Sequence, residues 1–120
     1  MVTALGKFLR KLRLDNDELL FDMAGKIDVP TSTLSAVETG KRRPSKGLAK
    51  KIIRAYRLTE EQMQQLYAGI SEANDWNIGI DASGFSPKDQ STAVAFARRF
   101  SDLDGEDKEA IWKILNKGKD

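Results

Sequence analysis

Hydrophobic residues recur every three or four positions through most of this chain, the spacing that places them on one face of an α-helix. Short breaks rich in Asp, Asn, Gly and Pro separate these stretches and are typical of turns. An all-α fold is therefore expected, with a five-helix bundle over residues 1–73. The pattern predicts helices at residues 3–14, 17–27, 31–39, 45–57, 59–73, 86–100 and 106–116.

The segment 74–85 has a different pattern, because Ile78, Ile80 and Ala82 alternate with polar residues or glycine. Such alternation is typical of a β-strand. A single short strand is not stable alone, so it would pair with the same strand of a second copy or with a sheet edge of another protein. The alternative is an extended linker whose isoleucines pack on the bundle.

Residues 86–120 are expected to form a helical hairpin, with Ser86 as the cap and Pro87 at the first helical position. A hairpin of about 30 residues buries little core of its own. Its apolar faces are expected to pack against a partner subunit, another protein or the bundle. The residues expected to mediate dimerisation or partner binding are Ile78, Ile80, Phe96, Phe100, Ile111, Trp112 and Leu115.

Composition narrows the functions that these helices can serve. The 120 residues include neither cysteine nor histidine, which removes disulfides, thiolate nucleophiles, and the commonest general base and metal ligands. The acidic residues lie at predicted helix starts, where their interaction with the helix dipole explains them without catalysis. We therefore expect neither enzymatic activity nor a bound metal or cofactor. No apolar run approaches the about 18 residues needed to span a membrane. The N-terminus lacks a signal-peptide core, so a cytoplasmic protein without a membrane partner is expected.

Charge is distributed unevenly along the chain. Residues 1–58 carry 13 Lys and Arg against 6 Asp and Glu, a net +7, whereas residues 59–120 carry 7 against 12, a net −5. The asymmetry indicates that only the first half faces a polyanion. The plain alternative is that both halves simply present solvated surfaces.

Residues 17–45 combine two short predicted helices, a tight turn at 28–30, a glycine at residue 40 and a run of cations. This arrangement can lay one helix in a groove of DNA. Over roughly the first 58 residues the chain resembles the XRE (Cro / lambda-repressor-like) helix-turn-helix family of transcriptional regulators. The residues that carry the resemblance are Ala24, Ile27, Val29, Leu34-Ser35-Ala36-Val37-Glu38 and Gly40-Lys41-Arg42-Arg43-Pro44.

Three residues depart from the family pattern. Asp28 stands where the family usually has a turn glycine, and aspartate tolerates left-handed geometry better than most residues. Leu20 replaces the Gln that often contacts phosphate at the start of the first of the two helices. Pro30 takes the usual Ser or Thr cap position of the second, recognition helix, and proline is compatible with a helix start. Upstream, Asp17 is expected to cap the first of the two helices.

The resemblance implies roles for individual residues. Base edges would be read by Thr31, Ser32 and Ala36, whose short side chains offer single hydrogen bonds and methyl contacts. Modest direct readout is therefore expected, with much of the affinity from phosphates and some specificity from DNA shape. Arg13 would pair with Glu38 and hold the recognition helix at a fixed angle. The residues expected near phosphates are Thr33, Ser35, Lys41, Arg42, Arg43 and Lys46.

These features predict a sequence-specific transcriptional repressor that binds double-stranded DNA as a homodimer. Two recognition helices would enter successive major grooves about 34 Å apart on a near-palindromic operator, and negative autoregulation is a family expectation. The resemblance covers a prophage repressor, an antitoxin with a cognate toxin as partner, and a regulator controlled by a neighbouring metallopeptidase. The alternative from another class is a protein-interaction module with a helix-turn-helix fold that does not read DNA.

Overall fold

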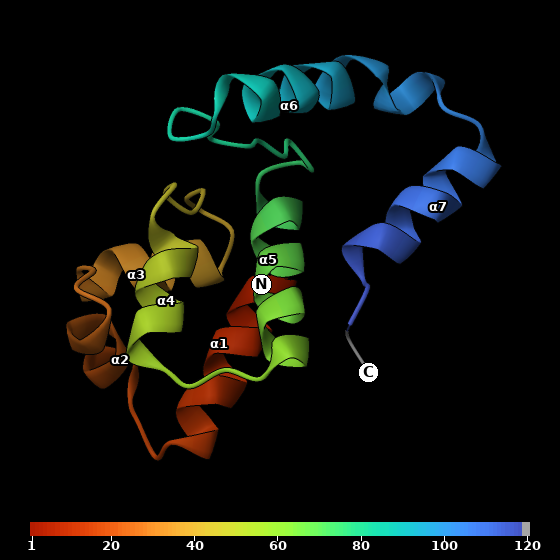
Figure 1. Cartoon of the computed structure of the whole chain (residues 1–120). Coiled ribbons are helices and arrows are strands. Elements are labelled where there is room, and N and C mark those ends of the chain that lie inside the picture. The colour runs from red at the N-terminus through yellow and green to blue at the C-terminus, as the bar shows by residue number, and fades with distance from the viewer. Residues whose placement is uncertain (119–120) are drawn as a thin grey trace. The chain divides into compact units, whose positions relative to one another are not determined.

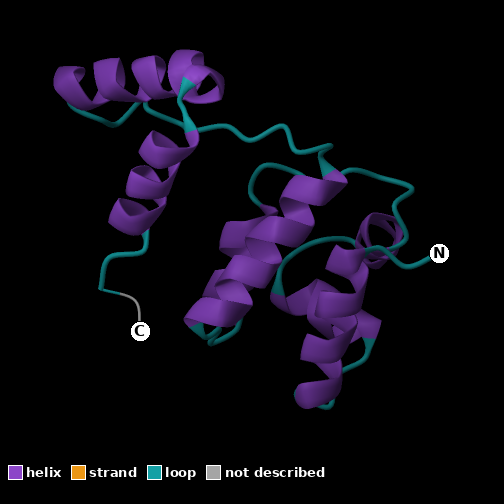
Figure 2. Cartoon of the chain, turned by 90° about the vertical axis from the view of Figure 1, so that its right-hand side faces the viewer, coloured by secondary structure: helices purple, strands orange, loops and turns teal. Residues whose placement is uncertain are grey.

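The computed structural model describes residues 1–118, over which the chain forms helices and loops and no strand (Figure 1, Figure 2). It divides into two compact units, Met1–Ile78 (unit 1) and Gly79–Asp120 (unit 2). The predicted all-α class is confirmed. The helices are α1 (Ala4–Asp15), α2 (Leu20–Lys26), α3 (Thr31–Glu38), α4 (Leu48–Ala55), α5 (Glu60–Ala73), α6 (Pro87–Arg99), the 3-10 helix η1 (Phe100–Asp102) and α7 (Gly105–Leu115).

The core of unit 1 lies between its five helices. α1 packs against α3 and α5, α2 packs on α3, and α4 packs on α5; α1 and α5 run side by side in Figure 1. The buried apolar side chains of these helices form one hydrophobic cluster. Burying one large aliphatic side chain contributes about 1.5–3 kcal/mol relative to leaving it exposed, so this cluster is the main source of stability for unit 1. Its fully buried apolar members are Leu5, Leu9, Met23, Ile27, Leu34, Ile52 and Leu66.

Two turns that flank α3 have the backbone geometry expected from the sequence. Asp28 has a φ of 55° and Gly40 a φ of 78°, both in the left-handed region. That region costs most L-residues about 1–2 kcal/mol, whereas glycine adopts it freely and aspartate more readily than most. Pro30 is the N-cap residue of α3. The short connection therefore brings α2 and α3 together as a helix-turn-helix.

The beginning of α1 is fastened to the end of α3. The Glu38 backbone oxygen accepts hydrogen bonds from the Thr3 N–H (3.0 Å) and from the Thr3 hydroxyl (3.1 Å). A Cβ atom on Gly6 would lie only 2.3 Å from the same oxygen. Glycine at residue 6 therefore allows the close crossing that sets the position of α3.

We expect Gly6→Ala to lower the free energy of unfolding by about 1–3 kcal/mol, because the added methyl group overpacks a backbone contact. Urea unfolding followed by circular dichroism measures the change. The matched control is Gly25→Ala, since a Cβ on Gly25 meets nothing within 4 Å. That control should instead gain about 0.5–1 kcal/mol from the helix preference of alanine. Equal effects at both positions would contradict the steric explanation.

The predicted start of the second helix, with Asp17 as its cap, is wrong. α2 begins at Leu20 with Leu19 as the N-cap residue, and Asp17 lies in the preceding turn with a φ of 54°. The Leu19 N–H donates instead to the Asp22 carboxylate, 2.9 Å away. Asp22 thus supplies a polar contact that the leucine side chain cannot make.

The other helices, except α4, begin within one residue of the starts predicted from the sequence. The predicted helix at 45–57 begins only at Leu48, because residues 45–47 form a turn that ends in a glycine. For α5, the Thr59 hydroxyl accepts from the Gln62 N–H at 3.1 Å, and the Gln62 side chain accepts from the Thr59 N–H at 2.9 Å. This is the expected capping box.

The alternating segment forms no strand within the described chain. α5 ends at Ala73, and Asp75 and Trp76 follow with left-handed φ values of 57° and 61°. Ile78 and Ile80 are 72% and 59% exposed, so neither side chain is packed in a core. Alternation does not make a strand where no second strand is present. Pairing between copies stays a prediction.

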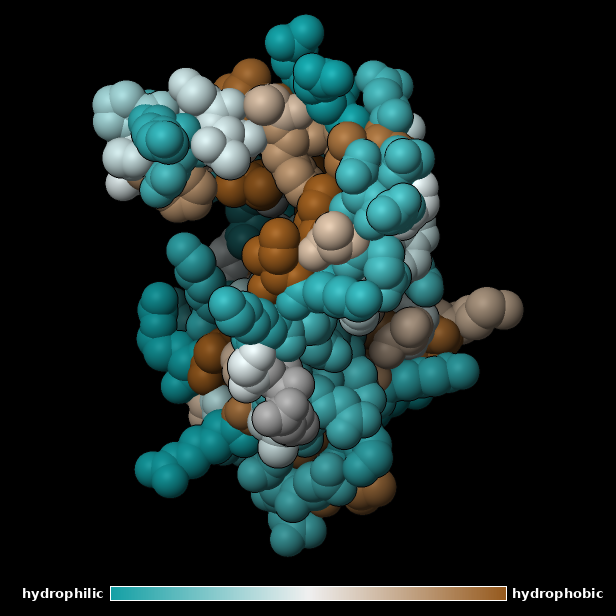
Figure 3. Space-filling view, turned by 45° about the vertical axis from the view of Figure 1, so that its right-hand side comes forward, coloured by the Kyte–Doolittle hydropathy of each residue, from teal (hydrophilic) through white to brown (hydrophobic). Residues whose placement is uncertain are grey.

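Unit 2 contains the two predicted C-terminal helices. The Ser86 hydroxyl caps α6 by accepting from the Asp89 N–H at 3.2 Å, and Asp104 caps α7. The rings of Phe96 and Phe100 lie 5.3 Å apart. No residue of α6, η1 or α7 is buried, and hydrophobic residues, brown in Figure 3, reach the surface of the face shown. The packing of these helices as a hairpin therefore stays a prediction.

Candidate nucleic-acid interface

α3 has a buried side and an accessible side. Leu34 and Val37 are buried among the helices of unit 1 and fix its orientation. Helical spacing leaves the short polar residues on the other side. The structure thus places the predicted base-reading and phosphate-contacting residues of α3 together: Ser32 and Ser35 are exposed, and Thr31, Thr33 and Ala36 are half-buried.

A buried ion pair holds the end of α3 against α1. Arg13 donates two hydrogen bonds to the Glu38 carboxylate, of 2.5 and 3.0 Å, and its guanidinium also lies 3.4 Å from the sulfur of Met23. Arg10 Nε is 3.6 Å from the same carboxylate. The side chains of Arg13 and Glu38 are only 10% and 2% exposed. The structure therefore joins the two residues that the family resemblance paired.

The basic loop, Lys41 to Arg43, follows α3 directly. The N–H groups of Lys41 and Arg42 both donate to the Ala36 carbonyl, at 2.9 and 3.2 Å, which folds the loop against the last turn of α3. The three cations are exposed, whereas Pro44 is buried and anchors the loop. Lys46 is also exposed, in the turn before α4. Cations next to an exposed helix face are well placed to neutralise phosphates.

One contact of the basic loop was not foreseen from the sequence. Arg43 Nη2 forms an ion pair with Asp75 Oδ2, in the turn that follows α5. Both side chains are exposed, by 66% and 75%. The two residues are 32 positions apart, so no local spacing rule links them and only the tertiary fold reveals the pair.

Phe21 was also missed by the sequence reasoning. It lines a shallow hollow of about 360 Å³ together with Thr31 and Pro30 at the start of α3, and it is 74% exposed. The sequence signal that could have identified Phe21 is that a large apolar residue stands on the polar side of α2. An aromatic ring beside Thr31 adds apolar surface to the candidate interface, of the kind that can contact a thymine methyl group.

Glu18, Lys26 and Tyr56 connect the α1–α2 turn to the end of α4. The Tyr56 hydroxyl donates to the Glu18 carboxylate at 2.6 Å, and Lys26 forms an ion pair with Glu18 and lies 4.8 Å from the centre of the Tyr56 ring. Burial alone would raise the pKa of Glu18, but hydrogen bonds from Lys26 and Tyr56 and the charges of Lys26 and Arg13 lower it below its ordinary value. Burial and the Glu18 contact raise the pKa of Tyr56.

This cluster predicts a pH-dependent contribution to stability. Because the pKa of Glu18 is lower in the folded state than its ordinary value of 4.5, its contribution is fully present above about pH 5.5 and is lost as pH falls below 4.5. We expect Glu18→Gln to be less stable than the wild type at pH 7 and to approach it at pH 3. Urea unfolding at both pH values measures the difference, and a gap that persists unchanged at pH 3 would contradict the linkage.

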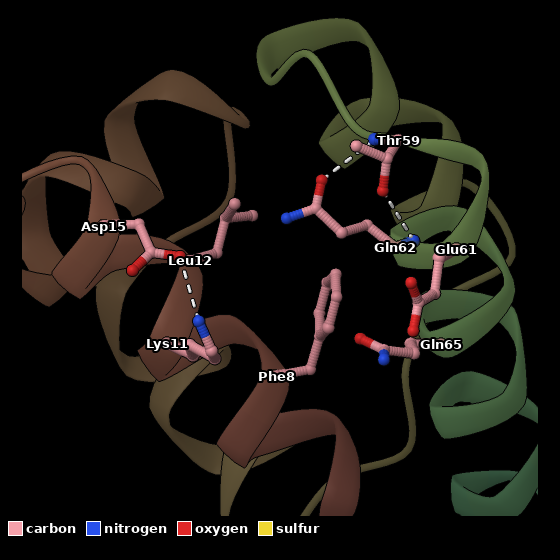
Figure 4. Close-up of a pocket in the computed structure, with 8 residues that line it drawn as sticks. All are labelled: Phe8, Lys11, Leu12, Asp15, Thr59, Glu61, Gln62 and Gln65. Atoms are coloured by element: carbon pink, nitrogen blue, oxygen red, sulfur yellow. Dashed lines mark hydrogen bonds and ion pairs between the residues drawn. The ribbon is translucent and has the colours of Figure 1, made fainter.

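A hollow of about 310 Å³ between α1 and α5 is explained by helix packing (Figure 4). Phe8 projects between the two helices (Figure 4), and several of the polar side chains around it are paired with each other. Lys11 pairs with Asp15 at 3.3 Å, and the capping box of Thr59 and Gln62 forms another part of the lining. Within residues 1–118, no group of three or more His, Cys, Asp or Glu could hold a metal ion.

Comparison with known proteins points to the same part of the chain. A family model described as a helix-turn-helix domain matches residues 4–66, slightly more than half of the 120 residues. The match includes α3, the basic loop and the Arg13–Glu38 pair. No curated protein and no solved structure matched the chain. Among residues 1–118, no helix combines the length and apolar character needed to cross a membrane.

Proposed function

Since the chain belongs to the helix-turn-helix domain family of the XRE/Cro-like type, we propose that it is a sequence-specific transcriptional repressor that binds double-stranded DNA. The proposal is carried by the exposed side of α3, which the buried Arg13–Glu38 pair supports and the basic loop extends. This type of domain is a DNA-binding fold rather than an enzymatic one. α3 would be the recognition helix in the major groove.

The side chains of α3 indicate how the DNA would be read. Thr31, Ser32 and Ala36 make single hydrogen bonds or methyl contacts at most, rather than the bidentate contacts that discriminate strongly between bases. Phosphate contacts from Lys41, Arg42, Arg43 and Lys46, with Thr33 and Ser35 nearby, would therefore supply much of the affinity. The remaining specificity would come from DNA shape.

We propose further that the protein acts as a homodimer on a near-palindromic operator, and that it regulates its own gene. The support for association is that α6, η1 and α7 contain no buried residue although Phe96, Phe100, Trp112 and Leu115 are large and exposed. Two short helices gain most of their stability from packing. A second copy would cover these faces, together with Ile78, Ile80 and Ile111, and set the spacing of two α3 helices.

The test is a titration of the purified protein on DNA from its own upstream region and on scrambled DNA of equal length, at two salt concentrations. We expect at least about 10³-fold tighter binding to its own DNA and a linear fall of log affinity with log salt. If the protein binds both DNAs equally, and still does so after a candidate toxin from a neighbouring gene is added, the repressor proposal is overturned. Sedimentation of the complex gives the number of copies per operator.

A second candidate is a protein-interaction module that keeps the fold without reading DNA, with a toxin or another protein as its partner. Leu20, in place of the family's phosphate-contacting Gln, and the short side chains of α3 favour it. Charge reversal at Arg42 and Arg43 would then leave function intact, whereas polar substitution of Ile78 or Phe100 would abolish partner binding. The repressor proposal expects the first pair of changes to abolish DNA binding.

A further inference from the structure

The ion pair between Arg43 and Asp75 links the basic loop to the turn after α5. Asp75 is a carboxylate in contact with a guanidinium that otherwise faces solvent. A carboxylate offers Arg the same planar pair of acceptor oxygens as a phosphate group does. Asp75 therefore offers Arg43 the same kind of acceptor that a DNA phosphate would offer.

The backbone around Asp75 is ordered by hydrogen bonds to the end of α5. Its N–H donates to the Glu72 carbonyl at 3.0 Å, and the Trp76 N–H donates to the Ser71 carbonyl at 2.7 Å. Asp75 and Trp76 both have left-handed φ values, and Trp76 lines a hollow of about 400 Å³ with Phe8 and Gly69 of α1 and α5. These contacts hold the Asp75 side chain next to the basic loop.

We infer that Asp75 sets the DNA affinity of this protein by competing with a DNA phosphate for Arg43. The inference rests on the proposed function and adds an affinity-determining residue outside the helix-turn-helix. Before DNA binds, the carboxylate neutralises Arg43. When DNA binds, the carboxylate keeps Arg43 and the phosphate contact is forgone. The pair therefore reduces by one the net positive charge that the loop brings to the DNA.

The size of the effect follows from the exposure of the pair. Exposed ion pairs contribute little, so removal of the competing carboxylate should tighten DNA binding by only about two- to five-fold. The salt dependence is the sharper measure. Each additional neutralised phosphate steepens the slope of log affinity against log salt by about 0.9.

The experiment measures the affinity of four proteins for one DNA duplex, taken from the protein's own upstream region, over a series of salt concentrations. The four proteins are the wild type, Asp75→Asn, Arg43→Gln and the double variant. We expect Asp75→Asn to bind about two- to five-fold tighter, with a slope steeper by about 0.9. In the Arg43→Gln background the same substitution should change neither affinity nor slope. Glu72→Gln is the matched control, because it removes an exposed carboxylate of α5 and should leave the slope unchanged.

Each outcome decides the inference. If Asp75→Asn tightens binding equally with and without Arg43, the carboxylate acts as general negative charge and the competition is overturned. An unchanged salt slope for Asp75→Asn overturns the competition as well. In either case, specific binding of the wild type to its own DNA leaves the proposed function standing. If the wild type binds neither its own nor scrambled DNA, the proposed function fails and the inference fails with it. Urea unfolding of each variant verifies that it is folded.

Discussion

Glu38→Gln is expected to lower the free energy of unfolding by about 3–5 kcal/mol, because it leaves the buried Arg13 guanidinium without a counter-charge. The Glu38 side chain is 2% exposed and that of Arg13 is 10% exposed, so water cannot replace the lost carboxylate. The loss is a large fraction of the about 5–15 kcal/mol by which domains are stable. Urea unfolding followed by circular dichroism measures it.

Two comparisons identify the cause of that loss. Lys11→Ala removes the exposed Lys11–Asp15 pair in the same helix and should cost no more than about 0.5 kcal/mol. The double variant Arg13→Met, Glu38→Leu removes both buried charges and should recover most of the stability that Glu38→Gln loses, since an apolar pair of similar volume is often neutral. A cost for Glu38→Gln as small as that for Lys11→Ala would refute the assignment of a buried charge pair.

The helix-turn-helix could be predicted from the sequence because its determinants are local. Asp28 and Gly40 supply left-handed backbone at the two ends of α3, and the apolar spacing of Leu34 and Val37 defines its buried side. The capping box at Thr59 is likewise a contact over three residues. Each of these features depends on neighbours in the chain, which the sequence displays directly.

The start of α2 was predicted wrongly because contacts with distant residues outweigh the local cap signal there. Asp17 is a good N-cap residue by type, but it lies in the turn with a left-handed φ of 54°. Glu18, the next residue, reaches across to Tyr56 and Lys26. Those tertiary contacts hold the chain extended through Leu19, so that the helix begins at Leu20.

The features that only the structure reveals join distant segments. Arg43 and Asp75 are 32 residues apart, and the close contact of Gly6 with the Glu38 backbone joins α1 to the end of α3. The alternation at Ile78 and Ile80 predicted a strand, but a strand needs a hydrogen-bonding partner. Within the described residues no second strand lies beside this segment, so alternation was insufficient evidence for a strand.

Ser32→Glu is expected to weaken binding to the protein's own upstream DNA by at least about 100-fold. Residue 32 is exposed in the first turn of α3, where the proposed interface meets the DNA. A carboxylate there would face phosphates and base-edge acceptors, and like-charge contacts at an interface cost several kcal/mol, with each 1.4 kcal/mol worth about tenfold. Fluorescence anisotropy with a labelled duplex measures the loss.

The fold of this variant should be intact, because an acidic residue in the first turn of a helix stabilises it by about 0.3–1 kcal/mol. Gln64→Glu is the matched control: it makes the same change of charge at an exposed position of α5, and we expect a change in DNA affinity of less than about threefold, as for an exposed charge that makes no contact. Ser32→Ala should weaken specific binding by only about two- to tenfold, the loss of one hydrogen bond. If Ser32→Glu binds as tightly as Gln64→Glu, α3 does not enter the groove, and the interaction-module function becomes the better explanation.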